Sequence, residues 1–298
     1  MEWQQIVGFY HTARLGSFTK SAEVTFRSQS ALSQQVKALE EELACQLLER
    51  IGKRKLRLTE AGERFLRFSE ALLENYDRLQ EELHEIKGRP QGYLRIAAPF
   101  TTLYHLFRDI WRDYVSRFPQ VKLSILDRSQ QSVIDLVKAG EIDFGLALES
   151  VVPKNLVARR WHKVEMVLMT PRGHPLAQAR RVTLKEIAQY PLILPPAGLK
   201  YPGRRTLEEA LRKLGASYHI IMESSNVELS SLYVELGLGL SFATIVPDLA
   251  FLEKRRLAFV SLGHYFKPDF IAVVMRQDKL LAPYKRAFLE MLLGHKVA

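Results

Sequence analysis

Residues 17–61 read SFTKSAEVTFRSQSALSQQVKALEEELACQLLERIGKRKLRLTEA, and they predict two helices followed by a basic hairpin. Because a serine hydroxyl can accept a hydrogen bond from a free backbone N–H at a helix start, Ser17 predicts a helix that runs to about Phe26. Ser28 predicts a second helix that runs to about Leu43. Two helices joined by so short a turn have the spacing of a helix-turn-helix.

The second predicted helix has one apolar and one polar face. Its apolar residues recur at the i, i+4, i+7 and i+11 spacing of a buried face, and they are Leu32, Val36, Leu39 and Leu43. The outer side carries Gln29, Ser30, Ser33, Gln34 and Lys37. Polar groups of this kind suit base edges and phosphates, so we expect these five residues to read or anchor the major groove.

A basic segment follows the second helix. Residues 50–57, RIGKRKLR, carry five basic residues and no acidic one around Gly52. We expect a β-wing there, with Arg54 and Lys55 against the phosphate backbone, and phosphate contacts from Ser17 and Thr19 near the first helix start. Taken alone, the pattern equally fits a packed helical hairpin with a solvated basic tip.

Five short motifs punctuate residues 16–62. They are Gly16-Ser17-Phe18, Ser21-Ala22, Ser28-Gln29-Ser30-Ala31-Leu32-Ser33, Leu39-Glu40-Glu41-Glu42-Leu43 and Leu58-Thr59-Glu60-Ala61-Gly62. In this order the segment resembles the N-terminal winged helix-turn-helix of LysR-type transcriptional regulators. It departs from the family pattern at Thr25, Arg27, Ser30 and Ala44-Cys45. The resemblance implies a regulator that binds double-stranded promoter DNA.

Length and charge indicate several domains. A chain of 298 residues is expected to form two or three. The net charge is +10, yet residues 1–90 contain 14 basic and 14 acidic residues, so the whole excess belongs to residues 91–298. Within residues 1–59 nine basic residues stand against six acidic ones, and five of the nine lie in the predicted wing. The prediction of DNA binding therefore depends on local placement and not on bulk charge.

Residues 60–90 predict one long helix. An apolar stripe at alternating spacings of three and four continues until Gly88 and Pro90 end it, and it comprises Phe65, Phe68, Leu72, Tyr76, Leu79, Leu83 and Ile86. The stripe could pack on its own domain. We favour self-association, because a reading head of this size usually binds two half-sites. The resemblance likewise implies linker helices that pair two chains, and tetramers built from dimers.

From residue 91 onward, strand and helix patterns alternate. The predicted strands are residues 93–98, 121–126, 144–148, 165–169, 191–194, 219–222, 240–246 and 270–275. Helices are predicted at residues 103–118, 133–139 and 184–189, from about Thr206 with Glu209 placed for a capping box, and from about Val227. Such alternation predicts α/β lobes, each a parallel sheet covered by helices.

Three further motifs follow in order: Gly140-Glu-Ile-Asp143, Gly173-His-Pro-Leu176 and Val234-Glu-Leu-Gly-Leu-Gly239. With them, the region resembles the LysR-type effector-binding domain, which is built like a periplasmic binding protein with two lobes around a cleft. The resemblance implies domains at 1–59, 60–90 and 91–298. Lobe I would comprise 91–161 and 267–298, and lobe II would comprise 162–266.

A ligand in such a domain is expected beyond the carboxyl ends of the strands, where helix N-termini meet. Hydroxyl, amide or glycine positions at those ends are Thr101, Thr102, Ser129, Gly198, Asn226 and Thr244. Each could instead be an ordinary cap or turn. Their convergence, together with a basic excess that includes Arg204 and Arg205, favours a small anionic effector. The Ala188-Gln-Tyr-Pro191 run is similar to the cysteine-biosynthesis branch of the family, but Leu148 and Pro202 depart from it.

Other chemistry has little support. Cys45 is the single cysteine, so it predicts a packing residue and no internal disulfide. The eight histidines show no metal-ligand spacing, and we expect no cofactor, no metal and no enzymatic activity. We expect a cytoplasmic location, because neither a signal peptide nor an 18-residue apolar run is present. The two rival classes are a DNA-architectural protein without an effector, and an enzyme or binding protein with an accessory DNA head.

Overall fold

The computed structural model describes residues 1–51, 55–87, 91–199, 202–247 and 256–295. The chain divides into two compact units, Met1–Pro90 and Gln91–Ala298, and each is described by itself. Across the described ranges, no helix combines the length and the apolar character that a membrane span needs.

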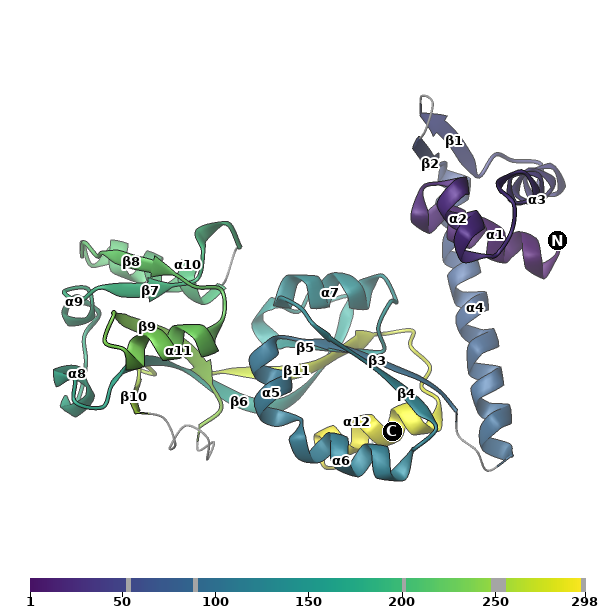
Figure 1. The fold of residues 1–298 in the computed structure, drawn as a ribbon. Coiled ribbons are helices and arrows are strands. Elements are labelled where there is room, and N and C mark those ends of the chain that lie inside the picture. The colour runs from purple at the N-terminus through teal and green to yellow at the C-terminus, as the bar shows by residue number, and fades with distance from the viewer. Residues whose placement is uncertain (52–54, 88–90, 200–201, 248–255, 296–298) are drawn as a thin grey trace. The chain divides into compact units, whose positions relative to one another are not determined.

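The first unit is a winged helix-turn-helix followed by a long helix (Figure 1). Its helices are α1 (Trp3–Leu15), α2 (Phe18–Val24), α3 (Gln29–Glu42) and α4 (Glu60–Ile86). The wing pairs β1 (Leu48–Ile51) with β2 (Lys55–Leu58) in antiparallel register. Both predicted serine caps are confirmed: Ser17 Oγ accepts from the Lys20 N–H at 3.4 Å, and Ser28 Oγ accepts from the Ala31 N–H at 3.2 Å.

Two features of this unit differ from the prediction. Leu43 is 37% exposed and not part of the core, because α3 ends at Glu42 and Leu43 is its C-cap. Leu32, Val36 and Leu39 are buried as predicted, and Val36 and Leu39 pack with Phe9 and Leu47. Phe9 belongs to α1, a helix that was not predicted from the sequence. This helix starts at Glu2, whose N–H donates to the Gln5 side chain at 2.7 Å.

The apolar stripe of α4 is divided between two environments. Toward its N-terminus, Phe65 packs edge-on against Phe9 of α1 with ring centroids 5.1 Å apart. Just past the midpoint, the ring centroid of Tyr76 lies 4.6 Å from that of Trp3. In its second half, Leu79, Leu83 and Ile86 are 49%, 41% and 82% exposed, respectively. The first half of α4 therefore packs on its own domain, whereas the second half presents an apolar face to solvent.

The second unit is an α/β domain with a mixed sheet. In lobe I the strand order is β4 (Val121–Asp127), β3 (Gly92–Ala98), β5 (Phe144–Leu148), β11 (Asp269–Arg276) and β6 (Leu156–Pro171). Helix α7 (Gln130–Lys138) covers one face, and α6 (Arg108–Arg117) with α12 (Pro283–Leu293) covers the other (Figure 1). The single helix predicted at residues 103–118 is wrong: α5 (Phe100–Leu106) and α6 are separated by Phe107, whose buried side chain anchors the break.

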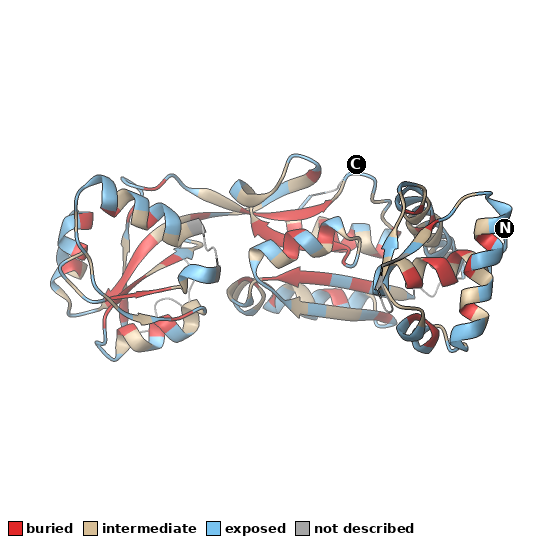
Figure 2. Ribbon diagram, turned by 90° about the horizontal axis from the view of Figure 1, so that it is seen from above, coloured by how far each residue is buried: buried red, intermediate tan, exposed pale blue. Residues whose placement is uncertain are grey.

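Lobe II is built on the second half of β6. That half lies between β9 (Leu240–Ile245) and β10 (Leu257–Ser261), and β7 (Leu192–Leu194) and β8 (Ile220–Glu223) continue the sheet from β9. Its helices are α8 (Pro175–Gln178), α9 (Leu184–Ile187), α10 (Pro202–Lys213) and α11 (Val227–Glu235), and short 3₁₀ turns span Glu149–Val151 and Ala197–Leu199. Buried residues line the central strands of both lobes (Figure 2).

The start predicted for α10 is wrong. The helix begins at Pro202, so Thr206 and Glu209 lie inside it and form no capping box. A capping box is present on α9 instead, where Thr183 Oγ1 accepts from the Glu186 N–H at 3.2 Å and the Glu186 carboxylate accepts from the Thr183 N–H at 2.8 Å.

Strand β6 joins the two lobes. Residues 156–164 pair with β11, and residues 165–171 pair with β9 and β10. All these pairings are antiparallel, as is β11 with β5. The prediction of parallel sheets therefore holds for β3 with β4 and β5 and for β7 with β8 and β9, and it is wrong for the strands that connect the lobes.

A buried carboxylate ties the C-terminal segment to lobe I. Asp143, the last residue of the Gly140–Asp143 motif, is 3% exposed. Its Oδ2 accepts from the Arg95 N–H at 2.8 Å, and its Oδ1 lies 3.2 Å from Lys279 Nζ and 3.3 Å from Lys285 Nζ. The Asp143 side chain thus connects three parts of the lobe: β3, α12 and the segment that follows β11.

We expect Asp143→Ala to destabilise the second unit by roughly 2–4 kcal/mol, because it leaves two lysines and a backbone N–H without their shared acceptor. Chemical denaturation of the full-length protein would measure this. The matched control is Asp113→Ala, since Asp113 is a 60% exposed partner of Arg112 and should cost less than about 0.5 kcal/mol. Equal effects of the two substitutions would contradict a structural role for Asp143.

Candidate nucleic-acid interface and ligand cleft

The solvent-facing side of α3 carries the residues predicted to read DNA. Gln29, Ser30, Gln34 and Lys37 are exposed, and Ser33 is half-buried. Lys37 Nζ lies 3.5 Å from Glu41, but both side chains are at least 66% exposed, so solvent screens this pair. The first turn of α3 therefore presents short hydrogen-bonding groups to the exterior, on a helix whose opposite face is fixed in the core.

The other predicted DNA contacts have mixed surroundings. Ser17 is half-buried and uses an Oγ lone pair to cap α2, while Thr19 beside it is exposed. In the wing, Lys55 begins β2 opposite Ile51, and Arg54 lies outside the described residues. Arg57 extends the basic character of the described wing: it is 70% exposed and lies 4.0 Å from Glu49 on the facing strand.

A cavity of about 520 Å³ lies between the two lobes of the second unit. Five of the six residues predicted to bind an effector line it: Thr101, Thr102, Ser129, Asn226 and Thr244. They come from α5, the start of α7, the start of α11 and β9. Gly198 does not line it and is exposed in a 3₁₀ turn; Gly203 and Arg204 line the cavity from the following helix.

Two of the five also cap helices. Ser129 Oγ accepts from the Ser132 N–H at 3.3 Å, and Asn226 Oδ1 accepts from the Glu228 N–H at 2.8 Å. The alternative role as helix caps is therefore real for both. The cap uses only the amide oxygen of Asn226, so its NH₂ can still donate to a ligand. The Ser129 hydroxyl also shares a hydrogen bond with Ser132 Oγ at 3.0 Å, in which either group can donate.

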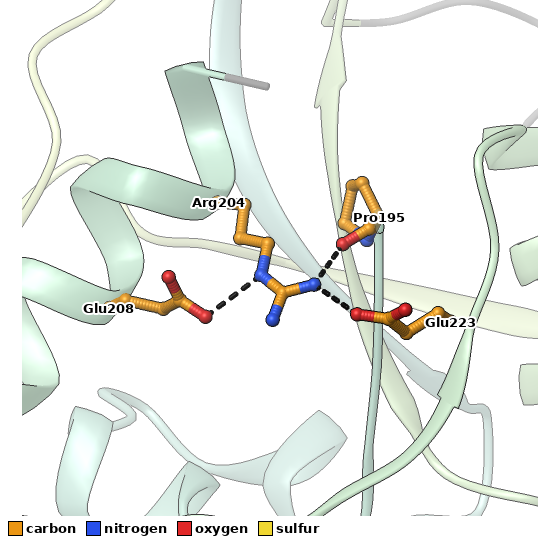
Figure 3. Close-up of polar contacts among 4 residues, drawn as sticks. All are labelled: Pro195, Arg204, Glu208 and Glu223. Atoms are coloured by element: carbon orange, nitrogen blue, oxygen red, sulfur yellow. Dashed lines mark hydrogen bonds and ion pairs between the residues drawn. The ribbon is translucent and has the colours of Figure 1, made fainter. Parts of the chain in front are cut away.

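Arg204 lines the cavity, but its charge is balanced within lobe II (Figure 3). Its guanidinium is 9% exposed; Nε donates to Glu208 at 2.8 Å, and Nη1 donates to Glu223 at 2.6 Å and to the Pro195 carbonyl. Hydrogen bonding from Arg204 lowers the pKa of Glu223. Arg205 is 84% exposed and pairs with Glu209 at 3.5 Å. Neither arginine presents an isolated positive charge to an anion.

Arg128 is the remaining cation among the residues that line the cavity. It is exposed, directly follows β4, and donates through Nη1 to the Asp127 carbonyl at 2.8 Å. It was not among the predicted residues, although its place at the carboxyl end of a strand is the same signal that identified Ser129. Gln130, also missed, accepts from the Leu148 N–H at 3.0 Å and so holds the end of β5 at the cavity wall.

A hydrogen-bonded pair of side chains links the lobes beside the cavity. His105 Nε2 of α5 lies 2.7 Å from Glu228 Oε1 of α11, and their side chains are 10% and 20% exposed. Both line a smaller adjoining space of about 70 Å³ that shares Thr101, Thr102 and Thr244 with the main cavity. The two residues are 123 positions apart, so no sequence pattern could have joined them.

Neither a metal-binding cluster nor a second cysteine that could pair with Cys45 is present in the described part of the chain. No group of three or more histidine, cysteine or acidic side chains there could hold a metal ion. Cys45 is half-buried in the DNA-reading head, which is the winged helix-turn-helix of the first unit, and packs at the edge of the core that contains Phe9 and Leu47.

Comparisons with known proteins match nearly the whole chain. Residues 3–63 match the family model described as bacterial regulatory helix-turn-helix protein, lysR family, and residues 87–296 match the LysR substrate binding domain. The regulator CysB of Burkholderia cenocepacia is 32% identical over 282 residues, which cover 93% of this chain and 88% of that protein.

Solved structures show the same fold. The cofactor-binding domain of the Cbl transcriptional regulator matches with a TM-score of 0.59 and 26% identity, covering 68% of this chain and 89% of that one. A full-length OxyR variant from Pseudomonas aeruginosa matches with a TM-score of 0.69 and 22% identity, covering 99% and 97% of the two chains.

We expect Arg204→Met to lower the melting temperature of the second unit at pH 7 by roughly 3–6 °C, because two carboxylates lose their shared cation. Since the pKa of Glu223 is lower in the folded state, the unfolded chain takes up this proton first, and stability falls as pH drops below the ordinary glutamate value. The variant should lack this part of the acid sensitivity.

Thermal melts at pH 7 and at about pH 3.5, a value below the ordinary glutamate pKa, would test this, with the solvent-exposed Arg205→Met as control. If Arg204→Met and the wild type lost equal stability between the two pH values, the proposed link between Arg204 and Glu223 would be wrong.

Proposed function

Because the chain belongs to the LysR family of bacterial transcriptional regulators, we propose that its interlobe cavity binds a small organic anion that controls its action on promoter DNA. The chain is a DNA-binding regulator with a ligand-binding domain, and not an enzyme. The observation that carries the proposal is the convergence of five predicted polar residues, from both lobes, on one cavity of about 520 Å³.

The lining of the cavity favours an anion with some apolar surface. Arg128 supplies a positive charge, and α7 and α11, each nine residues long, begin at the cavity with Ser129 and Asn226 as caps. Helix N-termini and hydroxyl donors suit a carboxylate or a sulfate-like group. Leu148, Met166 and Phe242 line the same space, which favours an organic acid over a bare inorganic ion.

For DNA, we assign the contacts to bases and to phosphates as follows. Gln29, Ser30, Ser33 and Gln34 would contact base edges, and Lys37 would anchor the groove. Ser17, Thr19, Arg54 and Lys55 would hold the phosphate backbone. Two copies would pair through the exposed half of α4, and two such dimers would form a tetramer, so that paired heads reach two half-sites in the cytoplasm.

The proposed mechanism is a shift between lobe arrangements. The His105–Glu228 pair favours the arrangement seen in this structure. An effector that contacts Ser129 from lobe I and Asn226 from lobe II would favour whichever separation satisfies both. The altered lobe geometry would then change how dimers pack, and with it the spacing and bending of bound DNA.

We expect Gln34→Ala to weaken binding to a selected operator by roughly 5–100-fold while leaving binding to random DNA nearly unchanged, because a base contact carries specificity. Arg57→Ala should weaken both and lower the slope of affinity against salt by about one, because a phosphate contact does not depend on sequence. Fluorescence anisotropy at several salt concentrations measures both. Equal losses of Gln34→Ala on operator and random DNA would remove Gln34 from the base-reading set.

For the effector, we expect acetate or succinate, but not neutral glucose, to raise the melting temperature of the full-length protein. Arg128→Gln should weaken the response to the stabilising anion by roughly tenfold, the cost of one lost charged hydrogen bond, and Thr101→Ala should weaken it less. Lys122→Gln, an exposed cation on β4, is the control. A response that is equal in Arg128→Gln and Lys122→Gln would exclude the anion site proposed here.

A further inference from the structure

Phe26 lies in the turn between α2 and α3, in a backbone conformation that favours glycine. Its φ is +55°, and the turn closes with hydrogen bonds from the Arg27 N–H to the Ala22 carbonyl at 2.9 Å and from the Phe26 N–H to the Glu23 carbonyl at 3.3 Å. This is a Schellman ending of α2, whose left-handed position is usually glycine because a Cβ is strained there.

The rest of the chain follows that preference. Helices α7, α10 and α11 end with the same pair of bonds, and their left-handed residues are Gly140, Gly215 and Gly237. In the head, α3 ends in this way with Ala44 at φ +52°. The reading head therefore places side chains at two positions where the effector domain uses glycine.

The Phe26 side chain does not stabilise the fold in compensation. It is 97% exposed, the highest value among the large apolar side chains of the described residues, and Ile86 at 82% comes next. A bulky residue that is strained and also unpacked adds nothing to the folded head. Strain of this kind at a fixed position is a reason to look for a binding role.

The neighbours of Phe26 indicate what it would contact. Ser28, two residues on, caps the helix whose exposed Gln29 and Ser30 point to solvent, and three residues of chain keep Phe26 within about 11 Å of Gln29. In a helix-turn-helix the N-terminal residues of the second helix meet base edges in the major groove. A phenyl ring has no hydrogen-bonding group, and the apolar feature that the groove offers is the C5-methyl of thymine.

We propose that Phe26 is a specificity-determining residue that contacts the methyl group of a thymine beside the bases read by α3. The proposal rests on the DNA-binding function and is independent of whether Gln34 reads a base. The closed turn fixes the backbone of Phe26, so binding to DNA would restrict only the torsions of its side chain.

Thymine-to-deoxyuridine replacement tests the proposal, because it removes only the methyl group. A preferred site is first selected from random duplex DNA with the full-length protein, and each thymine in it is then replaced in turn. We expect one position in each half-site at which the replacement weakens the wild type by roughly 3–10-fold, the loss from one methyl contact. The same replacement should not affect Phe26→Gly, whereas Phe26→Leu should keep part of the effect.

The matched control is Ala44→Gly. Both glycine substitutions relieve a left-handed residue and should raise the melting temperature of the head by roughly 2–4 °C. Ala44→Gly should leave DNA affinity and the deoxyuridine profile unchanged, which separates relief of strain from loss of a contact. Phe26→Asn, which also tolerates this conformation, checks that the effect does not come from glycine flexibility.

Three outcomes would overturn the proposal. The first is an equal loss of affinity by Phe26→Gly on the selected site and on random DNA, with no thymine whose replacement affects the wild type and the variant differently. That result would place the ring on deoxyribose. Unchanged DNA affinity would mean that Phe26 contacts something else, such as a second protein copy. A loss of affinity shared by Ala44→Gly would assign the effect to head geometry. If the wild type selected no preferred sequence, the proposal that α3 reads bases would be wrong, and the Phe26 proposal would be wrong with it.

Discussion

The arrangement of the effector domain depends on one continuous strand. β6 gives the backbone hydrogen bonds of residues 156–164 to lobe I and those of residues 165–171 to lobe II, and β11 lies against it in lobe I. A strand that is hydrogen-bonded in both sheets keeps its polar backbone paired on either side of the junction, so the lobes stay joined along it. The helices that begin at the facing edges of the two sheets, α7 and α11, consequently border one cavity.

Charge in that cavity is distributed less simply than the basic composition of residues 91–298 indicates. The most buried guanidinium, Arg204, is held by Glu208 and Glu223 and joins α10 to the Pro195 turn and β8. Its role is to shape the wall. In the proposed site, recognition of an anionic ligand would fall to Arg128 and to neutral donors at helix starts, which act over short distances and discriminate by geometry as well as by charge.

Local signals in the sequence predicted several helices that begin with short polar caps, but they placed the start of α10 wrongly at Thr206 and missed elements that lack such a cap. Ser17, Ser28, Ser129 and Asn226 each cap the helix expected after them. Helix α1 has Glu2 as its N-cap, and the first half of β6 contains Arg159, Arg160 and Lys163, so neither shows the expected signature. Five of the six residues chosen by strand-end reasoning line the cavity, but that reasoning missed the His105–Glu228 pair, because a contact across 123 positions follows from tertiary packing alone.

The contact between His105 and Glu228 also bridges the two lobes in the absence of a ligand. Under the proposed mechanism, this bridge would have to break before the lobes adopt another arrangement, so it would add to the free energy that an effector must supply. Tight binding is then not the same as signalling: a molecule that fits both arrangements equally well could fill the cavity and leave transcription unchanged. Only a ligand whose affinities for the two arrangements differ by more than this free energy could change the state of the protein.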